Sequence, residues 1–128
     1  MAKTLAMVFG VVFILVGVLG FVENPLVGAA GIFETDMLHN VVHLLFGIIL
    51  LGVALKAQAK SALWLKILGV VYLLLAIIGF VMVPEGGALL GLVHANAADH
   101  YLHIVLGVVL VAAGFLAKGN SSMPNPGM

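Results

Sequence analysis

Four long apolar stretches dominate the sequence and decide what the chain can fold into. They run approximately over residues 4–22, 37–55, 63–83 and 101–117, and each is close to the roughly 20 residues that an α-helix needs to cross about 30 Å of hydrocarbon. In lipid every backbone N–H and C=O group must be satisfied within the segment, which favours helices. A transmembrane barrel needs strands of alternating polarity, and these stretches are apolar on all sides. We therefore predict an all-α membrane protein with four transmembrane helices and no strands.

The composition agrees with a bilayer environment, since 64% of the residues are hydrophobic and only 8% are charged. A soluble domain is about one quarter charged. The chain has no arginine, and its five lysines are balanced by five acidic residues. This composition argues against nucleic-acid binding. It has no cysteine, which excludes disulfide scaffolds, cysteine-ligated zinc and thiol chemistry.

The few charged residues separate by sign along the chain. The lysines fall at the N-terminus, around the middle loop and after the last stretch: Lys3, Lys56, Lys60, Lys66 and Lys118. The acids fall in the other two loops and at the helix starts that follow them: Glu23, Glu34, Asp36, Glu85 and Asp99. Lysine in short loops marks the cytoplasmic side of a membrane protein. We therefore predict that both termini and the middle loop are cytoplasmic.

The two halves of the chain match when the sequence is shifted by about sixty residues. The matched positions include Gly20-Phe21-Val22 with Gly79-Phe80-Val81, His43 with His103, and Gly47 with Gly107. Each unit contains two spans, so both units enter the membrane in the same direction, as parallel repeats do. We predict one transmembrane domain over residues 1–118, a four-helix bundle of two tandem hairpins at about 5–55 and 64–117. Residues 119–128 are polar and rich in Pro and Gly, and we expect a disordered tail there.

The first stretch has a second interpretation as a signal peptide. A lysine, an apolar run and the small residues 27–30 are also the pattern of a secretory signal with its cleavage site. The apolar run is longer than the usual signal core of about 7–15 residues, and the repeat gives this stretch a structural counterpart. We therefore expect it to remain as a membrane helix.

The five histidines all lie on the acidic side or in the outer part of a span. Two sets of residues recur every four positions and so share a helix face: His39, His43 and Gly47 in the second stretch, and Asp99, His103 and Gly107 in the fourth. If both faces point inward, His43 and His103 oppose each other one to two turns below the outer surface. The candidate ligand or cofactor residues are therefore His39, His43, Asp99 and His103, supported by Asn40, Asn96, His100, Gly47 and Gly107.

The other polar residues on this side receive simpler interpretations. We expect His94 to lie solvent-exposed in a loop, and the loop glutamates to be solvated charges. Asp36 or Thr35 before the second stretch, and Asn96 before the fourth, are natural N-caps. Tyr72 lies inside the third stretch, and we expect its hydroxyl to find a carbonyl or a polar neighbour.

Four interpretations of the histidine cluster stay open. A haem or chlorophyll could be held by His43 and His103 as axial ligands, with Gly47 and Gly107 making room for the ring. A metal ion could be bound by His43 and His103, or by some of the set His39, His43, Asp99, His100 and His103, since imidazole and carboxylate suit zinc, iron or manganese. Ionisable groups inside a membrane can also form a proton or ion pathway. In the simplest interpretation the histidines hydrogen-bond across helices, and the glycines permit close packing.

Two polar segments resemble the paired signatures of a bacterial family. Residues 39–47 have the pattern HN-x-x-H-L, and residues 96–107 have the pattern N-x-x-D-x-x-x-H-x-x-x-G. The family consists of small four-pass membrane proteins filed as a domain of unknown function, and the resemblance covers residues from about 10 to 116. It implies a four-helix fold in the bacterial inner (plasma) membrane and no particular activity. The residues to which it directs attention are His39, Asn40, His43, Asn96, Asp99 and His103.

We therefore expect a small multi-pass integral membrane protein of non-enzymatic role, in which the polar cluster ties the two hairpins together. Its environment is the lipid bilayer, where it acts alone, as a homo-oligomer or as a subunit of a larger membrane complex. The alternative is a redox or ligand-binding protein that uses His43 and His103 to hold a haem, a chlorophyll or a metal ion. A second alternative is a small proton-linked carrier.

Overall fold

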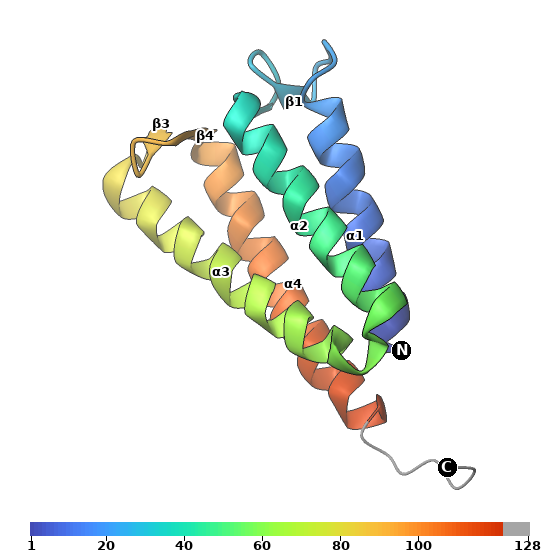
Figure 1. Ribbon diagram of the computed structural model, residues 1–128. Coiled ribbons are helices and arrows are strands. Elements are labelled where there is room, and N and C mark those ends of the chain that lie inside the picture. Colours follow the sequence, from blue (N-terminus) through green and yellow to red (C-terminus); the bar gives the residue numbers. More distant parts are fainter. Residues whose placement is uncertain (122–128) are drawn as a thin grey trace, which may run out of the picture.

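The computed structural model describes residues 1–121, which form four long helices (Figure 1). They are α1 (Ala2–Leu19), α2 (Met37–Lys56), α3 (Ser61–Met82) and α4 (Ala97–Ser121), and the 3-10 turn η1 (Gln58–Lys60) joins α2 to α3. Each helix is long and apolar enough to cross a membrane, so the prediction of four transmembrane helices is confirmed. Helix α4 continues to Ser121, and the rest of the predicted tail, residues 122–128, lies outside the described residues.

The helix ends are set by short polar side chains. We predicted that the first span reaches Val22, but α1 ends at Leu19. The reason is Asn24, whose side-chain amide donates hydrogen bonds to the carbonyl oxygens of Leu19 (2.7 Å) and Val27 (2.8 Å). These bonds satisfy a carbonyl that the helix end leaves free, and they turn the chain back over the end of α1.

The starts of α2 and α4 have the predicted N-caps. Asp36, rather than Thr35, caps α2, because its Oδ1 accepts a hydrogen bond from the backbone N–H of His39 at 2.8 Å. At α4 the cap is reciprocal: Oδ1 of Asn96 accepts from the N–H of Asp99 (3.0 Å), and Oδ2 of Asp99 accepts from the N–H of Asn96 (2.9 Å). This capping box starts α4 at Ala97, one turn earlier than the predicted Tyr101.

The helices pack in pairs, α1 with α2 and α3 with α4 (Figure 1). Glycines let the backbones of each pair approach closely. An added Cβ at Gly10 would lie 3.0 Å from the carbonyl oxygen of Gly47, and one at Gly69 would lie 2.9 Å from that of Gly107. These distances agree with the interpretation in which Gly47 and Gly107 permit close packing.

The two pairs meet along an apolar core and present apolar side chains to the outside. Phe13, Leu50, Leu65, Tyr72 and Leu110 are all at most 1% exposed and belong to one cluster. Many large apolar side chains on the outer faces of all four helices are more than one third exposed, as expected for a surface in contact with lipid. In Figure 1, α2 and α3 lie close at the turn that joins them and diverge toward the opposite end.

That opposite end carries strands, so the prediction of a chain without strands is wrong. β1 (Val27–Gly28) pairs in parallel with β2 (Phe33–Glu34), and β3 (Gly86–Leu89) forms an antiparallel hairpin with β4 (Val93–Asn96). The hairpin turns at Leu90 and Gly91, both at positive φ (55° and 70°). Four-residue strands are too short to give a clear alternation. They lie outside the apolar spans, where strand pairing can satisfy the backbone.

Candidate functional site

Three histidines from the two helix pairs meet near the strand-bearing end of the bundle. His39 and His43 lie one turn apart on α2, and His103 lies on α4. Each residue is at most 5% exposed, and one ligand-capable nitrogen from each lies within 4.8 Å of the other two. Because α2 and α4 belong to different pairs, the cluster depends on how the pairs pack together.

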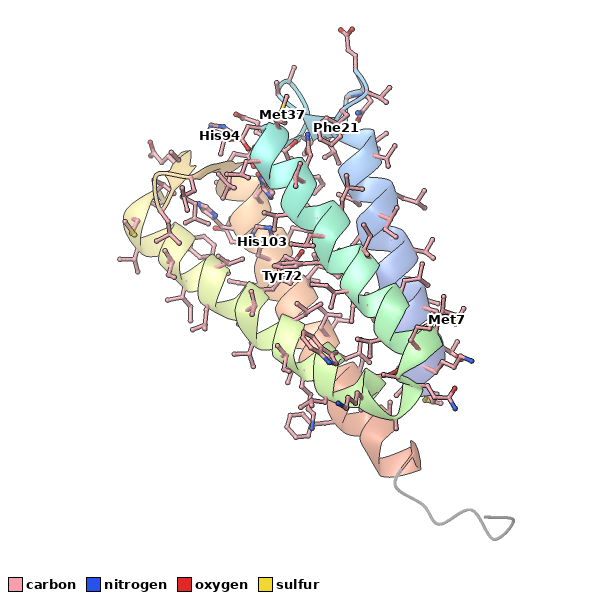
Figure 2. The ribbon with its side chains drawn as sticks, viewed as in Figure 1. Met7, Phe21, Met37, Tyr72, His94 and His103 are labelled. Carbon is pink, nitrogen blue, oxygen red and sulfur yellow. The ribbon has the colours of Figure 1, made fainter. Side chains whose placement is uncertain are left out.

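Aromatic contacts hold the three imidazoles in place. The rings of His39 and His43 stack with centroids 4.8 Å apart, and the ring of His103 is tilted against them at 5.9 and 6.3 Å. Tyr72 of α3 lies beside His103, with ring centroids 5.2 Å apart (Figure 2). Phe13 of α1 stacks on Tyr72 at 5.4 Å. All four helices therefore contribute to the walls of the cluster.

Tyr72 belongs to this site, although the sequence analysis did not include it among the candidate residues. Its hydroxyl lies 3.2 Å from Nδ1 of His43, which confirms the expectation of a polar neighbour. The signal in the sequence was the position of Tyr72 in the repeat, where the first half of the chain has Phe13. A hydroxyl added at a buried position needs a partner, and here the partner is a candidate ligand.

His94 joins the two helix pairs at the outer end. It lies on a strand rather than in the expected loop, while its side chain keeps part of the expected solvent exposure. It lies on β4, and its backbone N–H donates to Oδ2 of Asp36 at 3.0 Å. Its carbonyl oxygen accepts from Nδ1 of His39 at 2.6 Å. Its imidazole Nε2 lies 2.9 Å from Oε1 of Glu34, so Glu34, which is partly exposed as expected of a loop acid, also has a partner. The two side chains are 39% and 41% exposed.

These contacts also act on the two carboxylates at the outer end. The hydrogen bond from His94 lowers the pKa of Glu34, and a second one from Asn96 acts in the same direction. Burial alone would raise the pKa of Asp36, but the hydrogen bonds from the backbone N–H groups of His39 and His94 outweigh it and lower that pKa. Both groups are therefore carboxylates at neutral pH, and this end of the molecule is negative.

Asp99 lies apart from the three-histidine cluster. It is 2% exposed, and its Oδ2 is engaged in the capping box of α4. Its partner Asn96 extends to the other hairpin, where its side-chain amide donates to the carbonyl oxygen of Ile32 (2.9 Å) and to Oε2 of Glu34 (3.3 Å). Asn96 therefore helps to hold the hairpins together, while Asp99 borders a different cavity.

His100 and Asn40 are buried but take part in helix packing rather than in the cluster. Nε2 of His100 lies 2.7 Å from the carbonyl oxygen of Val83, and its ring lies against Gly79 of α3. The side chain of Asn40 lies against Gly20 in the same way. Each polar side chain thus fills the space that a glycine leaves on the neighbouring helix.

Two cavities border His43. The first has a volume of about 30 Å³ and is lined by the three histidines, Tyr72 and apolar side chains, some of them from β3 and β4. This is about the volume that one water molecule takes up in the liquid. The second has a volume of about 210 Å³ and is lined by His43, Asp99 and Thr35 among apolar side chains. The first cavity can accept an ion or water, and the second has room for a larger group.

Four apolar helices around a buried histidine cluster define a small multi-pass membrane protein. The chain belongs to a family described as a domain of unknown function, DUF4383, which matches residues 3–116. The match covers most of each of the four helices and the whole histidine cluster, in agreement with the resemblance seen in the sequence. No curated protein and no solved structure matches the chain.

Proposed function

We propose that this protein binds a divalent first-row transition-metal ion through His39, His43 and His103. One observation carries the proposal: a nitrogen of each buried imidazole lies within 4.8 Å of the other two. Zinc–nitrogen bonds of about 2.0–2.1 Å place ligand nitrogens roughly 3.3 Å apart, so small side-chain movements would complete the site. Imidazole ligands suit zinc, copper, iron and nickel.

The hydrogen bonds around the cluster support this assignment. Nδ1 of His39 faces the carbonyl oxygen of His94, which can only accept, so Nδ1 carries the proton and Nε2 keeps its lone pair. Metal-binding histidines typically donate their other N–H group to a carbonyl or carboxylate in this way. The Tyr72 hydroxyl can accept from Nδ1 of His43 in the same role.

His103 adds a second line of support. Its Nδ1 is buried and has no hydrogen-bond partner among residues 1–121. A buried polar atom without a partner costs free energy, and a bound ion would compensate that cost. Three protein ligands leave a further coordination position, which a water molecule in the 30 Å³ cavity would fill. A cavity of this size favours an ion over a haem or chlorophyll.

A second candidate is the structural role that the sequence suggested. The contacts of His39 with the His94 carbonyl and of Tyr72 with His43 each join the α1/α2 pair to the α3/α4 pair. In that case the histidines stabilise the bundle without an ion. Under either proposal the protein is a non-enzymatic component of the bacterial inner membrane, alone or in a larger complex, with its lysine-bearing end in the cytoplasm.

Metal binding by the purified protein in lipid nanodiscs tests the first proposal. After treatment with a chelator, we expect Zn²⁺ and Co²⁺ to bind at about one ion per chain, and His43→Ala or His103→Ala to weaken binding by about 100-fold or more. His100→Gln is the matched control, because it replaces a buried histidine outside the cluster. Failure of the wild-type protein to bind either ion would overturn the metal proposal. A His43→Ala variant that unfolds at the wild-type temperature would overturn the structural one.

A further inference from the structure

We propose that the second cavity binds a small organic ammonium ion with an apolar body, and that Asp99 receives its charged end. The cavity is bordered by α1, α2, α4 and the β1–β2 strands, and His43 lines both this cavity and the three-histidine cavity. The proposal goes beyond the metal site and does not depend on it, because Asp99 is not one of the three clustered ligands.

The walls of the cavity suit an apolar body of about the size of one aromatic ring. They consist mainly of apolar side chains, including Val16 and Leu19 of α1, Phe33 of β2 and Leu102 of α4. The volume is about 210 Å³. An engineered apolar cavity of about 150 Å³ binds benzene, so this cavity has room for a ring and a short polar extension.

The polar side of the cavity lacks a positive charge. Asp99 is 2% exposed, and its Oδ2 accepts one backbone hydrogen bond. No ion pair of Asp99 is found among the described residues, and the nearby His94 pairs with Glu34 instead. A buried carboxyl group without a counter-ion is costly to ionise. A ligand ammonium group would supply both the missing charge and N–H donors.

Thr35 provides a second, independent indication of a ligand. It lines the same cavity, is 3% exposed, and its hydroxyl oxygen has no hydrogen-bond partner within residues 1–121. A buried hydroxyl normally finds a partner in the protein or in bound solvent. An ammonium group held by Asp99 could donate to this oxygen, so that one ligand would satisfy both residues.

The surrounding charges favour a cation over an anion or a neutral ligand. Glu34 and Asp36 flank Thr35 in the sequence, while the lysines of the described helices lie toward the other end of the bundle. An alcohol could hydrogen-bond to Asp99 but would not stabilise its ionised form, whereas an ammonium ion would, and a carboxylate would be repelled by the ionised form. Affinity should therefore fall from the ammonium ion to the alcohol to the carboxylate.

Three ring compounds of similar size test this order: benzylammonium, benzyl alcohol and benzoate. Binding is measured by ligand-detected NMR with the protein in nanodiscs, in the presence of a metal chelator, so that the result is independent of the metal site. Empty nanodiscs correct for partition into lipid. We expect benzylammonium to bind about tenfold more tightly than benzyl alcohol, and benzoate not to bind. Equal binding of all three compounds, or no binding beyond that of empty nanodiscs, would overturn the proposal.

Two variants locate the site. Asp99→Asn keeps an oxygen that can cap α4 but removes the charge, and we expect benzylammonium to bind to it no better than benzyl alcohol does. Glu85→Gln is the matched control, because it makes the same charge change at an exposed acid on the same end. Val16→Phe fills the cavity and should abolish binding with Asp99 intact, so the test stands even if Asp99→Asn does not fold. Unchanged benzylammonium affinity in either cavity variant would contradict the assignment.

Discussion

The α1/α2 hairpin and the α3/α4 hairpin share a packing scheme but differ in their polar groups. In both, two facing glycines bring the backbones together, Gly10 with Gly47 and Gly69 with Gly107. In both, a polar side chain from the second helix lies against a glycine in the first helix or at its C-cap, Asn40 on Gly20 and His100 on Gly79. The internal duplication itself stays a prediction, but these matched contacts are what it would lead one to expect.

The polar differences create the site. Tyr72 replaces Phe13 in the second hairpin and brings a hydroxyl to His43. Asp99 replaces His39 at the start of the second helix of the pair, and it lies apart from the cluster, beside the other cavity. The lesson is that glycines set the scaffold in both hairpins, while the divergence of a few polar residues produces one three-histidine cluster and one isolated carboxylate.

The outer ends differ as well. In the first hairpin, β1 and β2 contain two residues each and run parallel, whereas β3 and β4 contain four each and form an antiparallel hairpin. β4 makes contacts with both β2 and α2 of the first hairpin. The second hairpin thus supplies the strand β4, which joins the two hairpins at the outer end, and the first hairpin supplies the acids that β4 contacts.

The largest expected effect comes from the shared glycines. Gly10→Leu in the first hairpin and Gly69→Leu in the second should each destabilise the bundle by about 3 kcal/mol, because the added side chain meets backbone atoms that cannot move aside. Denaturant unfolding in detergent micelles, followed by circular dichroism, measures the change in the free energy of unfolding.

Gly52→Leu is the control for both glycine variants, since an added Cβ there meets nothing within 4 Å. It should leave the free energy of unfolding within about 0.5 kcal/mol of the wild-type value. If only one of the two hairpins proved sensitive, the shared packing scheme would not be energetically equivalent in the two halves.

His39 and Asp99 occupy corresponding positions in the two hairpins, and exchanging them tests whether those positions are equivalent. His39→Asp should weaken Zn²⁺ binding by about 100-fold, because a shorter carboxylate replaces an imidazole ligand and the bond to the His94 carbonyl is lost. Adding Asp99→His should not restore affinity, because position 99 borders the other cavity. Zinc titration against a competing chelator gives the affinities. Recovery of wild-type affinity in the double variant would mean that the two positions are equivalent, and the comparison of the hairpins would fail.

The helical spans could be read from the sequence because about 20 consecutive apolar residues leave a chain in lipid few other structures. The four-residue spacing of His39 and His43 likewise placed them on one helix face. The contribution of His94 could not be predicted, because it depends on the strand β4, whose backbone reaches His39 and Asp36 across the hairpins. The separation of Asp99 from the histidines could not be predicted from the sequence either, since it depends on how one pair of helices is rotated against the other.

A smaller effect is expected where the second hairpin is made to resemble the first. Tyr72→Phe should cost about 1 kcal/mol of stability through the lost hydrogen bond to His43, and it should weaken Zn²⁺ binding by about tenfold. Phe80→Leu is the control on the same helix, since Phe80 packs on His100 and Tyr101 outside the cluster. Thermal unfolding and zinc titration are measured on the same samples. A Tyr72→Phe variant with wild-type zinc affinity would remove Tyr72 from the site.

The smallest expected effect is on the pH dependence of stability, which should differ between the acidic residues at the outer ends of the two hairpins. The pKa of Glu34 and that of Asp36 are lowered in the folded protein, so each carboxylate stabilises the fold at pH values above its unfolded pKa of about 4. That stability is lost as the pH falls through the lowered pKa values. The contribution of these two carboxylates to the thermal unfolding temperature should therefore be constant from pH 7 to about pH 5 and be lost in a decline below about pH 4. Glu34→Gln should make the decline shallower, whereas Glu85→Gln, in the exposed turn of the second hairpin, should leave it unchanged. An equal response of the two variants would show that the contact between Glu34 and His94 does not contribute to stability, and that the outer ends differ in shape alone.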